Sequence, residues 1–294
     1  MRIGAKVPNS GPLPVERGIA PMAAELEAAG FGSLWVSDHI VMPRRIESRY
    51  PFAADGKPTW PSETPYFDAM IALAVMATAT RRAELGTAVL VLPLRHPVEL
   101  AKQAASIDVL SQGRLVLGIG AGWLAEEFEA LDVPFASRGR RFEEWAHLLR
   151  DCWNGEPAPF DGHYYRLPEG VICLPTPLHD IPLLVGGHSA IARSRGATSG
   201  NGWLAHQSAT ALDIDELRSG VEEMREVAKR AAKGPDEVRT TVRIIDSAQR
   251  VTEVARSLPR LREAGVDEVI VDVDWGRPGA AADTYGTLQD WADR

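Results

Sequence analysis

The sequence predicts a closed (β/α)8 barrel, the TIM-barrel fold, with insertion loops. Three observations predict it: short apolar runs recur eight times along the 294 residues, each is followed by a stretch with helical spacing, and most of the runs are continuously apolar. Continuously apolar strands are typical of a parallel sheet that is buried on both faces. An open doubly wound sheet is the alternative, and the count of eight strands is the main argument against it.

The predicted elements alternate from one end of the chain to the other. The strands are Arg2 to Val7, Ser33 to Ser37, Glu84 to Val91, Arg114 to Ile119, Pro182 to Val185, Gly202 to Ala205, Arg239 to Ile245 and Glu268 to Val273. The helices are Val15 to Ala29, Pro65 to Thr80, Pro97 to Leu110, Arg141 to Trp153, Ala190 to Ser199, Ala211 to Lys233, Val251 to Ala264 and Ala280 to Ala292. Proline in a first turn and glycine just past a helix end support these boundaries.

Two segments exceed a minimal barrel. Residues 42–64 are rich in proline, glycine and charge, and we expect them to form a lid over the barrel mouth, because loops of this length in compact domains are usually functional or mobile. Residues 156–180 contain "FDGHYYRL", which predicts a hairpin with its turn at Asp161 and Gly162. With no linker or internal repeat, residues 1–294 are expected to form a single domain.

Composition excludes several classes of protein. A net charge of −8 without a long basic run argues against a nucleic-acid partner. Two cysteines, Cys152 and Cys173, are too few for a disulfide framework, and no His or carboxylate pair has metal-ligand spacing, so no metal is expected. The chain has no long apolar segment, so we expect no membrane partner and a cytoplasmic location.

In a TIM barrel the catalytic groups lie at the carboxyl ends of the strands. Those ends gather a set of acidic, imidazole and glycine groups: Asn9, Ser37 to His39, Ala88 to Leu92, Gly120 to Trp123, Gly186 to Ser189, and His206. His39 is the candidate general acid or base, because an imidazole exchanges a proton near neutral pH. The alternative is that Asp38 caps the following loop and His39 is a hydrogen-bonded rim residue.

The stretch "LLVGGHSAIA" contains a strand, two glycines and the start of a helix. Free backbone N–H groups at such a helix start suit an anion such as a phosphate. The alternative is a tight turn with Ser189 as N-cap. His96 is expected at a helix start, His147 inside a helix, and His163 and His179 in solvent. Without a G-x-S-x-G motif, a hydrolase triad has no support.

"RLVLGIGAGW" departs from a dinucleotide fingerprint, because Gly122 is one residue early and Trp123 takes the place of the third glycine. Together with "SDH", "LGTAVLVLPLRHPVELAKQAASIDVLSQG", "GHYYRL" and "IPLLVGGHS…NGW", it resembles the luciferase-like monooxygenase superfamily, and most closely its deazaflavin (coenzyme F420) dependent oxidoreductases. The resemblance extends in order from the first strand to about Trp203.

The resemblance implies a TIM barrel with a flavin-like ring at the carboxyl-terminal mouth and a two-electron hydride transfer. By position, Asp38 would touch the polar edge of the ring, and His39 would be the acid or base near the reactive carbon. The backbone at Gly186, Gly187, His188 and Ser189 would bind the cofactor phosphate. The glycine run Gly118 to Trp123, with Gly120, Ala121 and Gly122 at its centre, would allow close approach beside the ring, and Ala88-Val89 matches a pair that often forms a non-prolyl cis peptide.

The chain also departs from part of this family. The sugar-phosphate dehydrogenases of the superfamily have a tryptophan four residues after the histidine and a glutamate after the third glycine, where this chain has Pro43 and Trp123. Sugar-phosphate activity is therefore not expected. Trp123 suggests a flat, apolar pocket, with a core role as the alternative.

Three functions remain as hypotheses. The preferred one is an F420-dependent oxidoreductase acting on a small organic substrate held under residues 42–64. The alternative is an FMN-dependent monooxygenase on the same scaffold, because the two cofactors share a ring shape and a phosphate. The third is a flavin-binding protein without catalysis, which the presence of Asp38 and His39 disfavours. The resemblance also suggests a homodimer.

Overall fold

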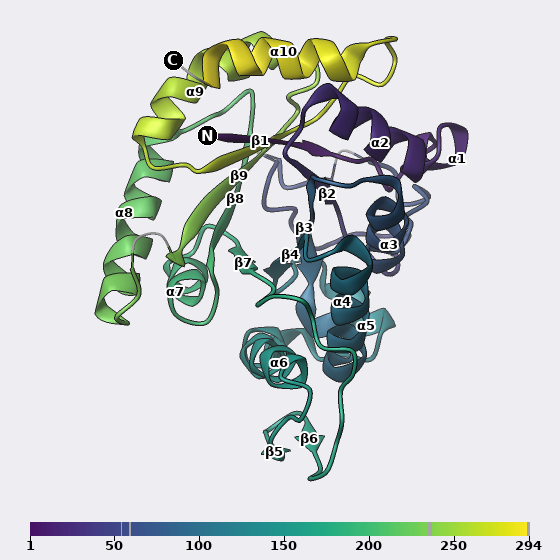
Figure 1. The fold of residues 1–294 in the computed structure, drawn as a ribbon, viewed down its shortest axis with the longest axis vertical. Coiled ribbons are helices and arrows are strands. Elements are labelled where there is room, and N and C mark those ends of the chain that lie inside the picture. Colours follow the sequence, from purple (N-terminus) through teal and green to yellow (C-terminus); the bar gives the residue numbers. More distant parts are fainter. Residues whose placement is uncertain (54, 59, 235–236, 293–294) are drawn as a thin grey trace.

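The computed structural model describes residues 1–53, 55–58, 60–234 and 237–292. Eight parallel strands close into a barrel in the order β1-β10-β9-β8-β7-β4-β3-β2, which confirms the predicted fold class (Figure 1). The strands are β1 Arg2–Lys6, β2 Ser33–Val36, β3 Glu84–Val91, β4 Leu115–Gly120, β7 Leu183–Gly186, β8 Gly202–Ser208, β9 Arg239–Ile245 and β10 Glu268–Val271. Each agrees with its predicted range to within three residues.

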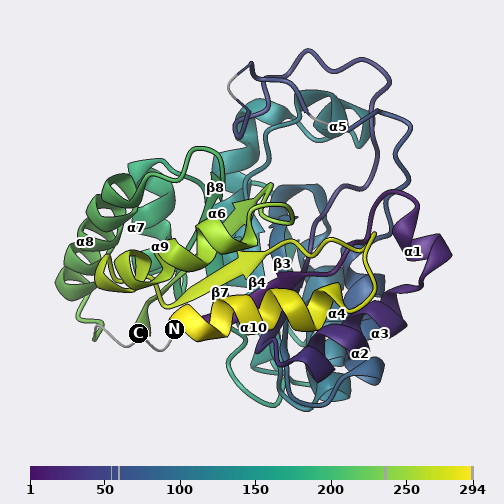
Figure 2. The ribbon, with the colours of Figure 1, turned by 90° about the horizontal axis from the view of Figure 1, so that it is seen from above.

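Helices pack around the outside of the barrel, as the two views in Figures 1 and 2 show. They are α1 Leu13–Glu16, α2 Ile19–Ala29, α3 Ala69–Ala79, α4 Pro97–Ser111, α5 Ala125–Ala130, α6 Arg138–Trp153, α7 Ala190–Thr198, α8 Ile214–Arg230, α9 Val251–Glu263 and α10 Ala280–Ala292. Two short 3-10 helices, Leu92–Leu94 and Phe135–Ser137, are also present among the described residues. Within the described residues, no helix combines the length and the apolar composition that a membrane span needs.

Three predicted helices have different boundaries for local reasons. The predicted helix from Val15 to Ala29 is two helices, α1 and α2, because Gly18 separates them at φ +80°. Helix α3 begins four residues later than predicted, since the Asp68 carboxylate accepts hydrogen bonds from the first-turn N–H groups of Met70 and Ile71. Helix α8 begins at Ile214, where Asp213 is its N-cap.

Alternate residues of the strands fill the barrel interior. Trp35, Val116, Leu184, Leu204 and Ile270 form one buried apolar cluster there. Towards the amino-terminal ends of the strands, the buried Glu268 carboxylate accepts hydrogen bonds from the Ser33 and Thr241 hydroxyls. This end of the interior is therefore closed by packed and hydrogen-bonded side chains, and the opposite end carries the candidate site. 

The chain between α6 and β7 contains the predicted hairpin. Strands β5 (Phe160–Asp161) and β6 (Arg166–Leu167) pair antiparallel. The turn predicted at Asp161 and Gly162 lies later, at residues 162–165, because Asp161 pairs with Arg166. The hairpin lies against α6, where the Glu144 carboxylate accepts the backbone N–H groups of His163 and Tyr164 at 2.9 and 3.0 Å.

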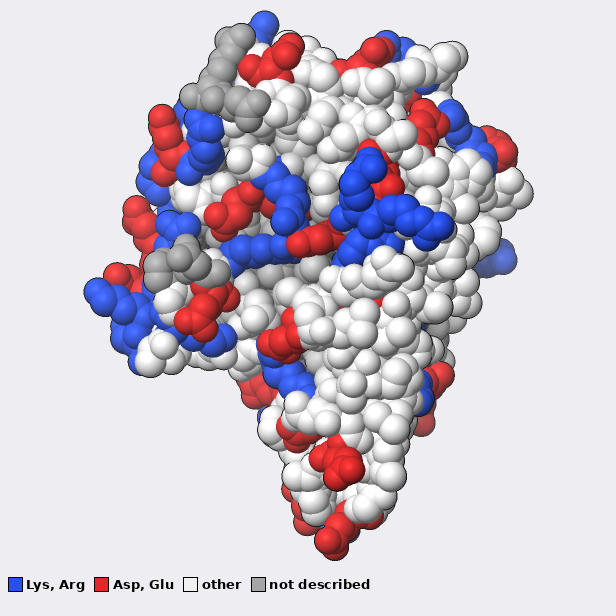
Figure 3. Space-filling view, viewed as in Figure 1, with Lys and Arg blue, Asp and Glu red and all other residues white. Residues whose placement is uncertain are grey.

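On the face seen in Figure 3, basic and acidic side chains are interspersed, and the lower part of that face is largely uncharged.

Candidate active site

His39 lies directly after β2 and is the central side chain of the candidate site. It is 8% exposed, and its Nδ1 is 2.9 Å from Oε2 of Glu127. Three aromatic rings surround the imidazole, those of Tyr66, Trp60 and Trp123, with centroids 5.2, 6.3 and 6.1 Å away. Among the described residues, hydrogen bonds reach only the Nδ1 side of the imidazole. The ring therefore has one nitrogen fixed by a carboxylate and the other, Nε2, available for a ligand.

Glu127 comes from α5 and is 1% exposed. Its Oε1 accepts the backbone N–H groups of Ile40 and Val41 at 2.7 and 3.3 Å, while Oε2 meets His39. These N–H groups and the imidazole give the buried carboxylate the partners that its charge requires. When Nδ1 carries a proton toward Glu127, Nε2 is the nitrogen that can take up or return a proton. Sequence reasoning missed Glu127, because nothing in "LAEEFEA" distinguishes it from the neighbouring Glu126.

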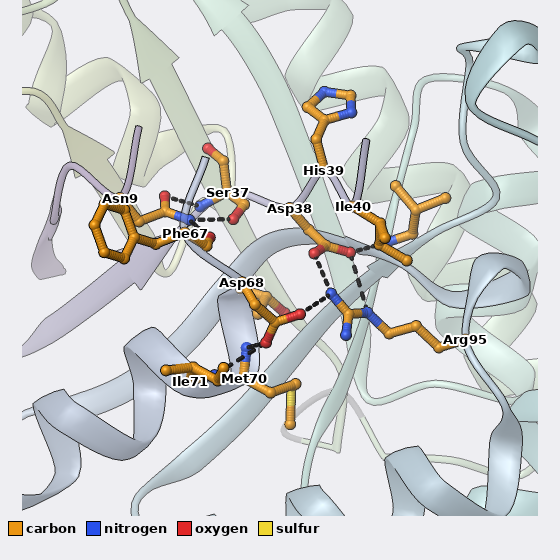
Figure 4. A network of polar contacts seen from close by, with 12 residues as sticks. Asn9, Ser37, Asp38, His39, Ile40, Phe67, Asp68, Met70, Ile71 and Arg95 are labelled. Carbon is orange, nitrogen blue, oxygen red and sulfur yellow. Dashed lines mark hydrogen bonds and ion pairs between the residues drawn. The ribbon is translucent and has the colours of Figure 1, made fainter. Parts of the chain in front are cut away.

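Asp38 points away from His39, as Figure 4 shows, because successive residues of an extended chain face opposite sides. Its carboxylate accepts the Val91 N–H at 2.9 Å and pairs with the Arg95 guanidinium at 2.5 Å. Arg95 also pairs with Asp68 at 2.9 Å. Burial raises the pKa of Asp38, although Arg95 and the Val91 N–H oppose this rise. In this arrangement Asp38 joins the end of β2 to β3 and to Arg95, and its contact with a cofactor stays a prediction.

Asn9 joins three parts of the rim (Figure 4). Its amide NH2 donates to the carbonyls of Ser37 and Phe67 at 2.8 and 3.0 Å, and its Oδ1 accepts the Ser37 N–H at 3.0 Å. Asn9 is fully buried. It therefore fixes the end of β2, which carries His39, relative to β1 and to the chain that enters α3.

The peptide between Ala88 and Val89 is cis, as the family resemblance predicted, and the pairing of β3 with β4 shifts register there. The Val89 side chain lies over two glycines of the neighbouring strands. A Cβ on Gly120 or on Gly186 would come within 2.7 Å of a Val89 methyl group. The two glycines therefore leave room for the Val89 side chain, which lies at the mouth of the barrel.

Gly122 and Trp123 follow β4. Gly122 has φ +86°, and a Cβ there would come within 2.7 Å of Phe128 and Val91. The Trp123 ring is 6.1 Å from the His39 ring and 5.1 Å from the Tyr50 ring. Trp123 therefore lies in the site beside His39, and the core role considered as an alternative does not apply. Ala121 lies between the two glycines and is partly buried.

The segment Gly187–Ser189 joins β7 to α7. Ser189 is the N-cap of α7, and its hydroxyl accepts the Ala192 N–H, as the simpler interpretation of this stretch predicted. His188 is held on both sides, with Nδ1 2.7 Å from Glu216 and Nε2 2.7 Å from the His206 carbonyl oxygen. Within the described part of the chain, no hydrogen bond uses the N–H groups of Gly187, His188 or Ser189. These groups remain available to an anion.

Residues of the 42–64 segment contact the carboxyl ends of the strands. Figure 2 shows this segment running beside α5, where the Glu126 carboxylate accepts the Glu47 and Ser48 N–H groups. The Phe52 ring stacks on His206 of β8 at 4.7 Å, and Tyr50 lies between Phe52 and Trp60 at 5.5 and 5.1 Å. Sequence reasoning placed this segment near the site but did not identify its aromatic residues as site residues.

The Trp60 indole N–H is buried and has no hydrogen-bond partner among the described residues. A buried donor of this kind costs free energy, about 1–3 kcal/mol, until an acceptor reaches it. Because Trp60 lies beside His39, an acceptor atom of a bound molecule would satisfy its N–H within the same site.

Other features of the chain lie outside this site. A cavity of about 570 Å³ opens at the amino-terminal ends of β1, β9 and β10, and is lined by residues such as Arg2, Arg239 and Glu268. Arg2 and Arg239 pair with Glu84 there, and this end of a TIM barrel usually serves stability. His96 caps α4, His147 lies within α6, and His163 and His179 are exposed, all as predicted. His179 also pairs with the buried Asp108. No group of three or more potential metal ligands occurs among the described residues.

Comparisons with known proteins show the family and the fold of the chain. The model of the luciferase-like monooxygenase family matches residues 5–289. An uncharacterized protein of Mycobacterium tuberculosis is 33% identical over 251 residues, 85% of this chain and 83% of that protein. An F420-dependent glucose-6-phosphate dehydrogenase of Amycolatopsis mediterranei is 28% identical over 225 residues, 75% of this chain and 62% of the dehydrogenase.

Solved structures share the fold at lower identity. An F420-dependent secondary alcohol dehydrogenase in complex with an F420-acetone adduct has a TM-score of 0.78 at 16% identity, with 100% of this chain and 99% of the other covered. A type II Baeyer-Villiger monooxygenase of Pseudomonas putida in complex with FMN has a TM-score of 0.74 at 16% identity, with 99% and 98% covered. The family match spans nearly the whole barrel, and the chain therefore belongs to the luciferase-like monooxygenase family.

Proposed function

We propose that the protein is an F420-dependent oxidoreductase that transfers a hydride between the deazaflavin and a small organic substrate. The observation that carries this proposal is the His39–Glu127 pair, a buried imidazole that has one nitrogen held by a carboxylate and aromatic rings around it. A planar redox heterocycle would lie against such rings and against the Val89 side chain at the mouth of the barrel. The F420-dependent relative supports the choice of cofactor.

The residues present fit such a cofactor in two places. Val89, Trp123 and Trp60 would hold the ring, and the unpartnered Trp60 N–H offers a donor to one of its polar atoms. The free N–H groups at Gly187–Ser189 would hold its phosphate at the start of α7, where the helix dipole favours negative charge. When bound, the deazaflavin supplies a carbon that accepts or gives up a hydride.

The chain itself supplies proton transfer and exclusion of water. His39 takes up or returns a proton at Nε2 as a substrate alcohol becomes a carbonyl or the reverse. Glu127 fixes the orientation of the imidazole through its contact with Nδ1. Tyr50, Phe52 and Trp60 cover the mouth, which keeps water from the reacting atoms. Because Trp123 takes the place of the glutamate expected in sugar-phosphate dehydrogenases, we propose no activity on sugar phosphates.

A fluorescence titration of the cofactor-free protein with F420 and with FMN tests this proposal. F420 is expected to quench tryptophan emission and to bind at least about tenfold more tightly than FMN, a difference of about 1.4 kcal/mol. Trp60→Phe should reduce the amplitude, because Trp60 lies in the site. Trp153→Phe is the control, since Trp153 packs between α6 and α4 and donates to Ala101. Tighter binding of FMN, together with oxygen uptake by the protein in the presence of reduced FMN, would instead support the monooxygenase. Binding of neither cofactor would contradict both functions.

A further inference from the structure

Four neighbouring strands place polar side chains at the carboxyl-terminal end of the barrel interior. They are Lys6 at the end of β1, His206 of β8, Arg243 of β9 and Asp272 just after β10, and we call them the polar sector. The register places His206 beside Arg243, and the pairing of Ala5 with Val271 places Lys6 beside Asp272. The Arg243 guanidinium joins the two pairs, because it reaches Asp272, two residues beyond its register partner Ile270. The neighbouring strands β3, β4 and β7 carry Ala88, Val89, Gly120 and Gly186 at the same end of the barrel. One side of the mouth thus carries apolar residues and glycines, and the other carries polar side chains.

Positive charge exceeds negative charge in the polar sector. The Arg243 side chain is 7% exposed and pairs with Asp272, the one carboxylate of the group. Lys6 has no carboxylate partner within the described residues, and its Nζ donates to Asn9 Oδ1 at 2.9 Å and to the Val7 carbonyl at 3.2 Å. An ammonium group has three donors, so one of them remains for a ligand. 

The excess of positive charge helps to lower the pKa values of Lys6 and His206. Burial and the charge of Arg243 lower the pKa of Lys6 to about 7, with Asp272 opposing them. Burial and the same guanidinium lower the pKa of His206 to about 3, so His206 is neutral near pH 7. An anion placed among these groups would reduce the mutual repulsion of Lys6 and Arg243 and would favour the charged form of Lys6.

An aromatic ring of the 42–64 segment lies against one member of the polar sector. Phe52 stacks on His206 at an interplanar angle of 26°, and the Tyr50 ring lies 5.5 Å from Phe52. A phenyl ring offers no acceptor to an ammonium or guanidinium group beyond its π face. A molecule that binds against the His206 ring of the polar sector would therefore displace Phe52.

We propose that the polar sector binds a carboxylate of the substrate, and that the enzyme acts on small organic acids. This inference rests on the proposed function, because it names the substrate class of the same site. Arg243 and Lys6 would bind the carboxylate, while the reacting carbon of the same molecule lies between the polar sector and His39. The ion pairs between the substrate carboxylate and these two side chains, away from the reacting carbon, would then orient the substrate.

The test uses a matched pair of probes, phenylacetate and phenylacetamide, which have similar shape and differ in charge. Their binding is measured by calorimetry at pH 7 on the protein saturated with F420 and on the protein without added cofactor. We expect phenylacetate to bind at least about tenfold more tightly than the amide. Lys6→Met should remove most of this preference, and Phe52→Ala should strengthen phenylacetate binding. Lys102→Met, at an exposed position of α4, is the charge-matched control and should change neither affinity.

Several outcomes would overturn the proposal: no binding of phenylacetate, equal binding of the acid and the amide, or an unchanged preference in Lys6→Met. A loss of F420 affinity in Lys6→Met without loss of phenylacetate affinity would also overturn it, because the polar sector would then belong to the cofactor site. Arg243→Met leaves Asp272 without its partner, so its binding data count only if its thermal unfolding matches that of the wild type. If F420 does not bind but the preference for the acid persists, the proposed cofactor fails and the carboxylate site stands.

Discussion

Replacing His39 by glutamine is expected to slow turnover by about 10²–10⁴-fold while F420 still binds with nearly unchanged affinity. Glutamine keeps a polar group of similar length but cannot exchange a proton near neutral pH, and the surfaces assigned to the cofactor, Val89 and the Gly187–Ser189 segment, are untouched. The measurement is the rate of F420 oxidation or reduction on the best substrate from a screen of small organic acids, alcohols and ketones. His147→Gln, on the exposed side of α6, is the matched control.

A substitution of Glu127 tests whether His39 depends on its carboxylate partner. Glu127→Gln keeps an acceptor for the Ile40 and Val41 N–H groups but loses its charge, so it should lower the rate without removing F420 binding. Unchanged turnover in His39→Gln would remove His39 from the mechanism.

Replacing Arg95 by methionine is expected to reduce the free energy of unfolding by about 3–5 kcal/mol at pH 7, because it leaves the Asp38 carboxylate buried without its cation. The side chain of Asp38 has no exposed surface and that of Arg95 is 10% exposed, so water cannot replace the guanidinium. Urea unfolding at equilibrium measures the change. Arg166→Met is the control, since the Arg166–Asp161 pair of the hairpin is exposed and should contribute at most about 1 kcal/mol.

The loss in Arg95→Met should depend on pH in a defined direction. Without Arg95, burial keeps the pKa of Asp38 above its ordinary value of 3.8, so the unfolded chain releases this proton more readily than the folded one. Stability relative to the wild type should therefore fall as the pH rises from about 4 through the raised pKa. The double variant Asp38→Asn with Arg95→Met should recover much of the loss. A pH-independent difference between Arg95→Met and the wild type would contradict this account of Asp38.

The fold could be predicted from the sequence because each barrel strand is a short apolar run with a helical stretch after it. The errors lie at helix boundaries, where one side chain decides. Asp68 and Asp213 cap helices later than the apolar pattern suggests, and Gly18 divides a stretch that reads as continuous. These boundaries depend on single hydrogen bonds and backbone angles, which hydrophobic periodicity does not report.

Part of the site could be predicted for the same reason, since parallel strands end at the same rim. His39 and Trp123 lie together there although 84 positions separate them in the chain. The partners of the site residues could not be predicted, because Glu127 and Arg95 reach it from outside the strands. Lys6 and Arg243 did leave a signal: each interrupts an apolar strand at a position that faces the barrel interior. A charged residue there is costly unless it has a partner or a function.

A crystal structure of the protein with bound F420 tests the central claim most directly. The account predicts electron density for the tricyclic ring at the carboxyl-terminal mouth, against Val89 and within reach of His39 Nε2, with the phosphate at the N–H groups of Gly187–Ser189. It also predicts that Phe52 leaves His206 when a carboxylate occupies the polar sector. Density for F420 in the cavity at the amino-terminal ends of β1, β9 and β10, or a ring placed away from His39, would contradict the account.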